Sequence, residues 1–486
     1  MTSILAIDAG TTNIKALLIG PAGNVISKAN YALGINYPQP GWVEQSPNEL
    51  WNGTREAIRS CLQNGPQVRV LAIGISNQRE TLVCWRRRDG CPLYPAIVWQ
   101  CRRSTDICDE WKAAGLARAI QRKTGLQVDP LFPATKIVWL LRNQPEIRTL
   151  ASRGEVCFGT VDSWLIWNFT GGKVFATDAS NASRTQLFNL ENASWDKDQL
   201  ALCGISAQDL PTIFPSNASY GEADLGTGQN VPIRGVLGDS HAALLGHGVA
   251  EAGIVKATYG TGSSLMTLTP DVPAEDRRIS RTVAWQLDRI RYAYEGNITV
   301  TGSGVAWASE FVGAGELESA VSRANSLKNN QGVYFVPALA GLGAPYWNDR
   351  ARGAIVGLSF ATTKEQLVRA AVEAIAFQIA DVFRAMEEAS KTRLNFLFAD
   401  GGATRNDWLM QFQADVLQRP VRRSRVPELS GFGAAVAAGQ GLGFWSSGPG
   451  TTETQSDLFS PKMSEAEAAE VIAEWQKAVE WANTHY

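Results

Sequence analysis

Six residues near the N-terminus, Asp8-Ala9-Gly10-Thr11-Thr12-Asn13, combine the groups that are needed to hold a phosphate. The glycine permits a tight turn, and the turn offers successive backbone N–H groups and two threonine hydroxyls, which is typical of phosphate-binding loops. Asp8 could hold a metal ion through water, and Lys15 adds a point charge. An ordinary hairpin with a polar tip is the alternative, because Asp-x-Gly is also common turn chemistry.

Two further glycine-centred turns follow apolar segments in the second half of the chain. One is Gly260-Thr261-Gly262, between the two arms of a segment that starts at Ile254, and the other is Asp400-Gly401-Gly402. A strand, a glycine turn and a helix in this order can form an anion or nucleotide platform. The turn at 260–262 repeats the pattern of the opening turn, which predicts a duplicated fold with two domains that face each other across a cleft.

Polar side chains also follow two apolar strands in the first half. The strand predicted at 68–75 leads into Arg79 and Glu80, and the strand at 232–237 ends at Asp239. In layered α/β domains the carboxyl ends of strands are where ligands bind. Asp239 could act in chemistry or cap the helix that follows it, and Arg79 and Glu80 could bind a substrate or form a surface ion pair.

Clear helix starts and apolar runs supply the elements that position these residues. The opening segment 4–19 reads as a hairpin, and Ser46-Pro47-Asn48-Glu49 starts a helix that runs to about residue 63. Thr363 with Gln366 starts a long core helix over 364–389, and Ser464 with Glu467 starts the last helix. The mixture of strands and helices predicts an α/β fold. A domain boundary is placed between 248 and 249, because the sequence is rich in Gly and Ala around 246–253 and a new β segment begins at Ile254.

Chain length, net charge and cysteine content limit the classes of function that are open to this protein. A chain of 486 residues exceeds what one hydrophobic core usually organises, so two large domains are expected. The net charge of −2 gives no broad attraction to nucleic acid. The sequence contains no run of about 18 apolar residues, so no membrane span is predicted. Seven cysteines without a C-x-x-C pair indicate free thiols in a reducing cytoplasm.

No P-loop and no protein-kinase signature set is present. The three glycine turns together resemble the actin-like ATPase fold, whose two ribonuclease H-like domains clamp a nucleotide. The whole chain resembles the FGGY carbohydrate kinases, and within them the glycerol kinase branch. The resembling blocks are Asp8-x-Gly-Thr-Thr, Gly41-Trp-Val-Glu, Asn77-Gln-Arg-Glu-Thr, Ala96-Ile-Val-Trp-Gln-Cys-Arg-Arg, Phe158-Gly-Thr-Val-Asp-Ser-Trp-Leu-Ile-Trp, Thr177-Asp-x-x-Asn-Ala-Ser-Arg-Thr, Tyr259-Gly-Thr-Gly, Gly341-Leu-Gly-Ala-Pro-Tyr-Trp and Asp400-Gly-Gly-Ala.

The resemblance implies an ATP- and Mg²⁺-dependent kinase of a small polyol or sugar, with an N-terminal domain over 1–248 and a nucleotide-binding C-terminal domain over 249–486. It implies that Asp239 is the catalytic base, that Arg79, Glu80 and Trp99 bind the substrate, and that Asp8 organises magnesium through water. The positions that match the nucleotide site are Thr11, Thr12, Asn13, Lys15, Thr261, Gly302, Gly402 and Asn406. Dimers or tetramers are common among such kinases.

Three substrate positions depart from the glycerol kinase pattern. Leu131 stands where an aromatic is expected, Ser240 where a glutamine is expected, and Ser264 where a second aromatic is expected. These changes enlarge the pocket and remove polar groups that would hold a triol, and missing hydrogen bonds change selectivity strongly. Two substrates stay open: glycerol, or a four- or five-carbon polyol or ketose, towards which the pocket leans.

Two other expectations come from the same resemblance. The loop over 225–232 carries no arginine for an allosteric sugar bisphosphate, which predicts insensitivity to fructose bisphosphate. An ATP-driven chaperone or filament, or a non-catalytic sugar sensor, would be a different use of the fold, and the presence of Asp239 argues against the sensor.

Overall fold

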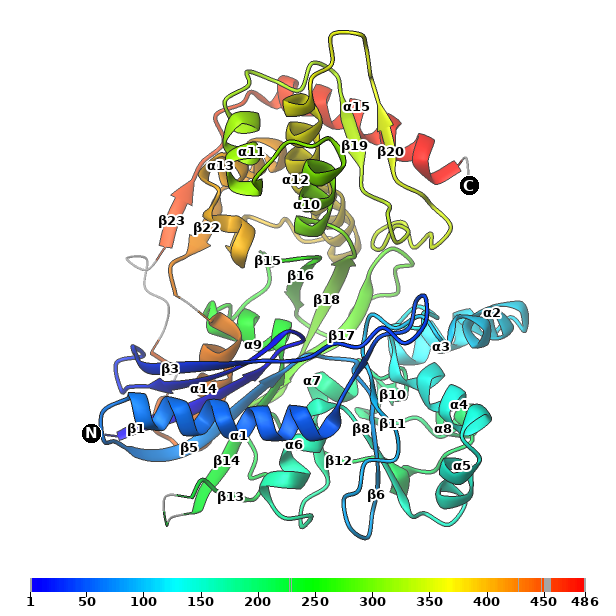
Figure 1. The fold of residues 1–486 in the computed structure, drawn as a ribbon, viewed down its shortest axis with the longest axis vertical. Helices are drawn as coiled ribbons and strands as arrows, with labels where there is room; N and C mark the ends of the chain where they lie inside the picture. The colour runs from blue at the N-terminus through cyan, green and yellow to red at the C-terminus, as the bar shows by residue number, and fades with distance from the viewer. Residues whose placement is uncertain are drawn as a thin grey trace. The chain divides into compact units, whose positions relative to one another are not determined.

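The computed structural model describes residues 2–226, 228, 230–426, 428–446, 448–449 and 456–484 (Figure 1). The chain forms two compact units. Unit 1 contains Met1–Ala250, Arg281–Ala293 and Glu428–Gly450, and unit 2 contains Glu251–Ser280, Tyr294–Pro427 and Thr451–Tyr486. This division differs from the expected boundary at 248/249, because two segments of the second half pack with the first. Thr227 and Gln229 of the loop considered for sugar bisphosphate lie outside the described residues.

The main sheet of unit 1 has the strand order β13-β14-β5-β1-β2-β3. Strands β1 and β2 form the hairpin predicted at 4–19, with Ile4 opposite Ile19, whereas β1, β5 and β14 run parallel. The strands are β1 (Thr2–Ala9), β2 (Asn13–Ile19), β3 (Val25–Ala32), β5 (Arg69–Asn77), β13 (Glu222–Asp224) and β14 (Asn230–Gly238).

Helices cover both faces of this sheet. Leu5, Ile7 and Ala9 of β1 pack in one apolar core with residues of helix α1 (Pro47–Asn64). Successive side chains of a strand point to opposite faces, so Ala6 and Asp8 point the other way, towards the glycine-rich helix α14 (Leu429–Gly441). Asp8 therefore lies on the face that α14 covers.

Helix α14 explains why a late segment belongs to unit 1. It packs on β1, β5 and β14 and on helix α9 (Asp239–Gly246). The packing requires glycine, because a Cβ on Gly74 would lie 2.2 Å from the carbonyl oxygen of Ala434, and one on Gly433 would lie 1.8 Å from that of Ala242.

Smaller elements complete unit 1. The paired short strands are β4 (Glu44–Gln45) with β7 (Ala96–Ile97), β6 (Val83–Arg86) with β8 (Val156–Gly159), β9 (Ala176–Asp178) with β12 (Thr212–Phe214), and β10 (Phe188–Asn189) with β11 (Ser194–Trp195). The remaining helices are α2 (Thr105–Ala113), α3 (Ala117–Thr124), α4 (Pro133–Asn143), α5 (Pro145–Ala151), α6 (Val161–Phe169), α7 (Ala179–Ala182), α8 (Lys197–Cys203) and the 3₁₀ helix Ala207–Asp209.

Unit 2 repeats this plan. The hairpin of β15 (Ile254–Tyr259) and β16 (Ser263–Thr269) is antiparallel, and β15 pairs in parallel with β21 (Phe396–Asp400), as β1 does with β5. Strands β22 (Val421–Ser424) and β23 (Ser456–Phe459) extend the sheet. The duplication that the two glycine turns predicted is therefore present in the strand order.

The other elements of unit 2 surround a core built on the long helix α12 (Lys364–Ser390). They are β19 (Tyr334–Val336), β20 (Ala354–Val356), α10 (Gly302–Phe311), α11 (Leu317–Asn325), the 3₁₀ helix Gly402–Arg405, α13 (Asp407–Leu417) and α15 (Glu465–Thr484). Strands β17 (Ser280–Gln286) and β18 (Ile290–Ile298) are divided between the units, since Arg281–Ala293 belongs to unit 1.

The helix starts read from the sequence are confirmed. Ser46 accepts a hydrogen bond from the backbone N–H of Glu49, and Thr363 and Gln366 form a reciprocal capping box. The side chain of Glu49 departs from the pattern, because it accepts from the backbone N–H of Gly34 instead. Within the described residues, no helix is both long and apolar enough to cross a membrane.

Candidate active site

Three neighbouring parallel strands of unit 1 end at one edge of the sheet and bring their polar residues together. Asp8 of β1 lies opposite Ser76 of β5, and Asn77 lies opposite Gly238 of β14. The hydroxyl of Ser76 donates to Oδ1 of Asp8 at 3.0 Å. Because Asp239 follows Gly238 directly, the register alone carries its backbone to the edge that holds Asp8.

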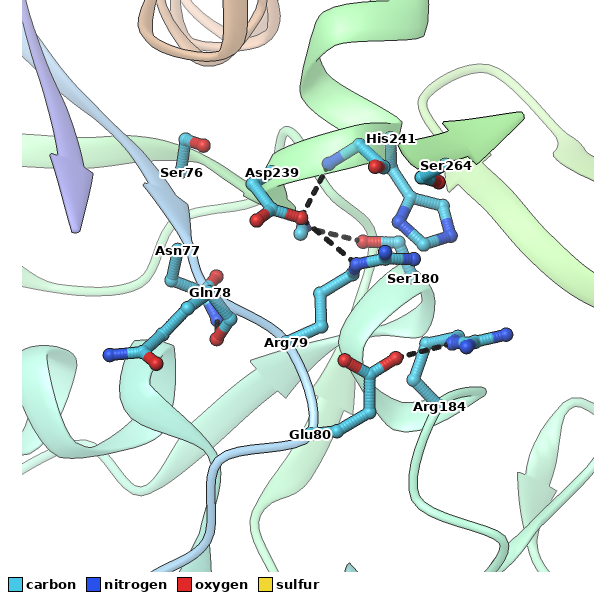
Figure 2. A network of polar contacts seen from close by, with 12 residues as sticks. Ser76, Asn77, Gln78, Arg79, Glu80, Ser180, Arg184, Asp239, His241 and Ser264 are labelled. Carbon is cyan, nitrogen blue, oxygen red and sulfur yellow. Dashed lines mark hydrogen bonds and ion pairs between the residues drawn. The ribbon is translucent and has the colours of Figure 1, made fainter. Parts of the chain in front are cut away.

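Asp239 is the first residue of helix α9, and Gly238 precedes it as the N-cap. Its Oδ1 accepts from Nε of Arg79 at 2.9 Å and from the backbone N–H of Ser240 at 2.6 Å (Figure 2). The Arg79 side chain is 7% exposed and that of Asp239 is 38% exposed. The pair is therefore a partly buried ion pair at the strand ends, not a surface contact, and it leaves the carboxylate accessible.

The backbone before Asp239 is fixed by a buried polar network. The N–H of Gly238 donates to Oγ of Ser180 at 3.0 Å, and the hydroxyl of Ser180 donates to Asp178 at 2.8 Å. The amide groups of Asn77 and Asn181 exchange two hydrogen bonds of 3.0 and 3.1 Å. These contacts tie the ends of β5 and β14 to helix α7.

Glu80 is buried and adopts a left-handed backbone conformation with φ of 62°. Its Oε1 accepts from Nε of the fully buried Arg184 at 2.6 Å (Figure 2). Its carbonyl oxygen accepts from Nζ of Lys136 at 2.8 Å. Burial lowers the pKa of Lys136 to about 7. Both the side chain and the backbone of Glu80 are thus held by buried basic side chains.

The three positions that depart from the glycerol kinase pattern lie on different elements. Leu131 precedes α4, its N–H donates to Asp129 at 2.8 Å, and its carbonyl oxygen accepts from Lys136 at 2.8 Å. Ser240 is buried as the second residue of α9. Ser264 belongs to β16 of unit 2, and its hydroxyl donates to the buried Glu295 at 3.2 Å.

The first glycine turn is connected to the predicted substrate residue Trp99. The N–H of Gly10 donates to the carbonyl of Asn13 at 3.0 Å and closes the turn. The indole N–H of Trp99 donates to Oγ1 of Thr11 at 2.9 Å, and the amide of Asn13 donates to Oγ1 of Thr12 at 3.1 Å. The backbone of Thr11 is also held, since its carbonyl accepts from Gln45 at 2.7 Å.

Asp8 sits among charged groups on the α14 face. Burial raises the pKa of its carboxyl from 3.8 to about 6; Lys15 opposes this rise, and the carboxylates of Asp239 and Glu428 add to it. Nζ of Lys15 lies 2.5 Å from Oε2 of Glu428, and these two side chains are 34% and 23% exposed. Burial and the two neighbouring carboxylates make the ionised form of Asp8 costly, and a cation bound beside Asp8 would relieve that cost.

Unit 2 carries the remaining nucleotide candidates at the carboxyl ends of β15 and β21. The carbonyl of Thr261 accepts from the N–H of Thr301 at 3.0 Å, and Gly302 opens helix α10. Gly402 opens a 3₁₀ helix after Gly401, whose φ is +98°. Asn406 caps α13, and its Oδ1 accepts from the N–H of Leu409 at 3.2 Å.

Three charged residues of this site were missed by sequence reasoning: Lys136, Arg184 and Glu428. Lys136 had a signal as a lone charge among mostly apolar residues, and Arg184 as a lone charge among small and polar ones. Glu428 had none, because its segment is remote in sequence from the hairpin it contacts.

Matches to the two family models cover most of the chain. The N-terminal domain of the FGGY family of carbohydrate kinases matches residues 3–246, and the C-terminal domain of the same family matches residues 255–442. The chain therefore belongs to the FGGY family of carbohydrate kinases, and it is an ATP-dependent kinase with the two-domain actin-like fold.

Relatives with different substrate names are about equally similar. The chain is 46% identical to apulose kinase of Pectobacterium atrosepticum, over 98% of this chain and 97% of that protein. It is 45% identical to glycerol kinase of Thermus brockianus, over 99% of both. The crystal structure of Plasmodium falciparum glycerol kinase with ADP superimposes with a TM-score of 0.91 at 32% identity, over 99% of this chain and 98% of that one. Overall similarity thus does not separate the substrates.

Proposed function

We propose that this kinase transfers the γ-phosphoryl group of ATP to a hydroxyl of a four- or five-carbon polyol or ketose, with Asp239 as the general base. The observation that carries the assignment of the base is the position of Asp239 at the carboxyl edge of β1, β5 and β14. In the reaction the substrate oxygen attacks the γ-phosphorus, the bond to the β–γ bridging oxygen breaks, and ADP leaves. The hydroxyl proton passes to the carboxylate.

The contacts of Asp239 suit this role. Both hydrogen bonds described for its carboxylate go to Oδ1, from Arg79 and from the N–H of Ser240. They orient the group, and we assign Oδ2 to receive the proton. The guanidinium of Arg79 fixes the orientation of the carboxylate through its hydrogen bond at 2.9 Å. Arg79 and Glu80 together offer a donor and an acceptor, which is what recognition of a diol needs.

Thr11, Thr12, Asn13 and Lys15 are proposed to contact the phosphates of ATP. Thr261, Gly302, Gly402 and Asn406 of unit 2 are proposed to contact the nucleotide. Mg²⁺ fits the carboxylate of Asp8, which burial and two neighbouring carboxylates make costly to ionise alone. When bound, Mg²⁺ would neutralise charge on the phosphates. The chain's own contribution is to hold Asp8 through the hydroxyl of Ser76.

The preference for an acceptor larger than glycerol rests on Leu131, Ser240 and Ser264. A phenol, an amide and a phenyl ring are replaced by a leucine and two short hydroxyls, so the site has more room and fewer groups to grip a three-carbon triol. The relative named apulose kinase is consistent with a kinase of this branch that acts on another substrate.

The substrate assignment is tested by an ADP-release assay with ATP, Mg²⁺ and a panel of polyols and ketoses. We expect the highest kcat/KM on a four- or five-carbon acceptor. A far higher value on glycerol would refute this substrate assignment and leave the kinase activity intact.

The base is tested by Asp239→Asn, which keeps the size of the side chain and removes its basicity. We expect kcat to fall by a factor of about 10²–10⁴ while ATP still binds, because general base catalysis contributes on this order. Asp109→Asn, at an exposed position of α2, is the matched control. A kcat within a few-fold of the parent would show that another group takes the proton.

A further inference from the structure

We propose that Lys136 is a positioning residue for substrate binding, which sets Glu80 and Leu131 at fixed places relative to each other. The inference rests on the proposed role of Glu80 in recognising the acceptor. It adds a residue that touches no substrate and acts through the backbone of two that do.

The geometry places one ammonium group between two loops. Lys136 lies in the first turns of α4, is fully buried, and donates from Nζ to the carbonyl oxygens of Glu80 and Leu131, both at 2.8 Å. One carbonyl belongs to the loop after β5 and the other to the loop before α4. The side chain therefore bridges two loops that each supply a candidate substrate residue.

The conformation of Glu80 explains why such a bridge is needed. A non-glycine residue with φ of 62° is strained, and it persists only where its surroundings fix it. Lys136 fixes the carbonyl, and Arg184 fixes the carboxylate at 2.6 Å. Arg184 in turn lies over the ring of Phe132, the residue after Leu131. Glu80 is thus anchored at both its backbone and its side chain.

A purely structural role for Lys136, as an anchor of α4, makes a different prediction from a positioning role. Loss of an anchor loosens the fold and lowers stability and turnover together. Loss of a positioning contact changes acceptor binding selectively, because the phosphate turn at Gly10 and the base at Asp239 lie on other elements. Comparing the change in KM for the acceptor with the change in KM for ATP therefore separates the two roles.

The test is Lys136→Met, which retains most of the buried volume and removes the donors. With the acceptor that gives the highest kcat/KM, we expect its KM to rise at least tenfold, while the KM for ATP changes less than threefold. Lys112→Met is the matched control, since Lys112 is exposed on α2, which packs against α4. Lys136→Gln, which keeps an amide donor, serves if the methionine variant does not fold, and we expect a smaller rise in the same KM.

A double variant with Glu80→Gln shows whether Lys136 acts through Glu80. If it does, Lys136→Met adds little to the KM of a Glu80→Gln enzyme, because residues that act as a unit are not additive. If Glu80→Gln raises the acceptor KM but the folded Lys136 variants leave it unchanged, the positioning role of Lys136 is overturned and the proposed role of Glu80 stands. An unchanged KM in Glu80→Gln overturns the proposed role of Glu80 as well.

Discussion

The ionised carboxylate of Asp8 should lower the free energy of unfolding, and substitution of Asp8 measures by how much. Its carboxyl is half-buried at the end of β1, it accepts from the hydroxyl of Ser76, and its pKa is raised by burial from 3.8 to about 6. Asp8→Asn keeps the shape and an acceptor for Ser76, and it removes the charge. We expect the variant to be more stable than the parent at neutral pH when ATP and Mg²⁺ are absent.

The sign and size follow from proton linkage. A raised carboxyl pKa means that the folded state binds a proton more tightly than the unfolded state, so the parent loses stability as pH rises from about 4 to about 6. At 1.36 kcal/mol for each pH unit between 3.8 and about 6, the penalty above pH 6 is at most about 3 kcal/mol. Below pH 4 the carboxyl is neutral in both states, and the advantage of the variant should vanish.

The assay is thermal unfolding of both proteins from pH 4 to pH 8. About 3 kcal/mol corresponds to roughly 5 °C for unit 1, at about 2.1 cal/mol/K of unfolding entropy per residue. Mg²⁺ with ATP should stabilise the parent more than the variant, and turnover of the variant should fall. Asp109→Asn should leave the profile unchanged. A variant that is less stable than the parent at pH 7.5, or a difference that does not depend on pH, would refute the electrostatic account of Asp8.

Two other substitutions test the contacts that hold the site. Trp99→Phe retains an aromatic ring and removes the indole N–H that donates to Thr11 at 2.9 Å. We expect a two- to tenfold rise in the KM for ATP and for the acceptor, because a lost hydrogen bond costs about 0.5–1.5 kcal/mol. Unchanged steady-state constants would show that this hydrogen bond does not contribute to binding. Gly433→Ala puts a Cβ 1.8 Å from the carbonyl oxygen of Ala242 in α9. Because such a contact forces the helices apart, we expect a Tm lower by several degrees in calorimetry and a lower kcat in the ADP assay. A Tm equal to that of the parent would contradict the close packing of α14 on α9.

Local patterns in the sequence predicted the elements that carry the site. The hairpin at 4–19 and the helix start at Ser46 follow from turn and capping chemistry, which depends on residues within a few positions of one another. The repeat of the hairpin at Ile254 predicted the duplicated strand order. The parallel pairing of β1, β5 and β14, which brings Asp8 near Asp239, was not predicted, because the rule for α/β folds says only that ligands bind at the carboxyl ends of strands.

Long-range partners were out of reach of this reasoning. Glu428 meets Lys15 across 413 positions of sequence, and no local signal links them. The boundary at 248/249 missed α14 for the same reason: its glycine and alanine content indicates a closely packed helix, but not which sheet it packs against. Lys136 was visible as a lone charge among mostly apolar residues, and Arg184 as a lone charge among small and polar ones. Their contacts depend on the left-handed backbone of Glu80, which no glycine near Glu80 indicates in the sequence.

The contacts of unit 1 join the predicted phosphate turn to the predicted substrate residues by short paths. Thr11 accepts from Trp99 through its hydroxyl and from Gln45 through its carbonyl, and Gln45 accepts from Gln78, which precedes Arg79 in the chain. The hydroxyl of Thr81 closes the path by donating to Gln78. These contacts couple Thr11 to Trp99 and Gln78, and they include neither Lys136 nor the backbone carbonyl of Glu80. A change of substrate is then accommodated most readily by side chains outside these paths, which is where Leu131, Ser240 and Ser264 depart from the glycerol kinase pattern.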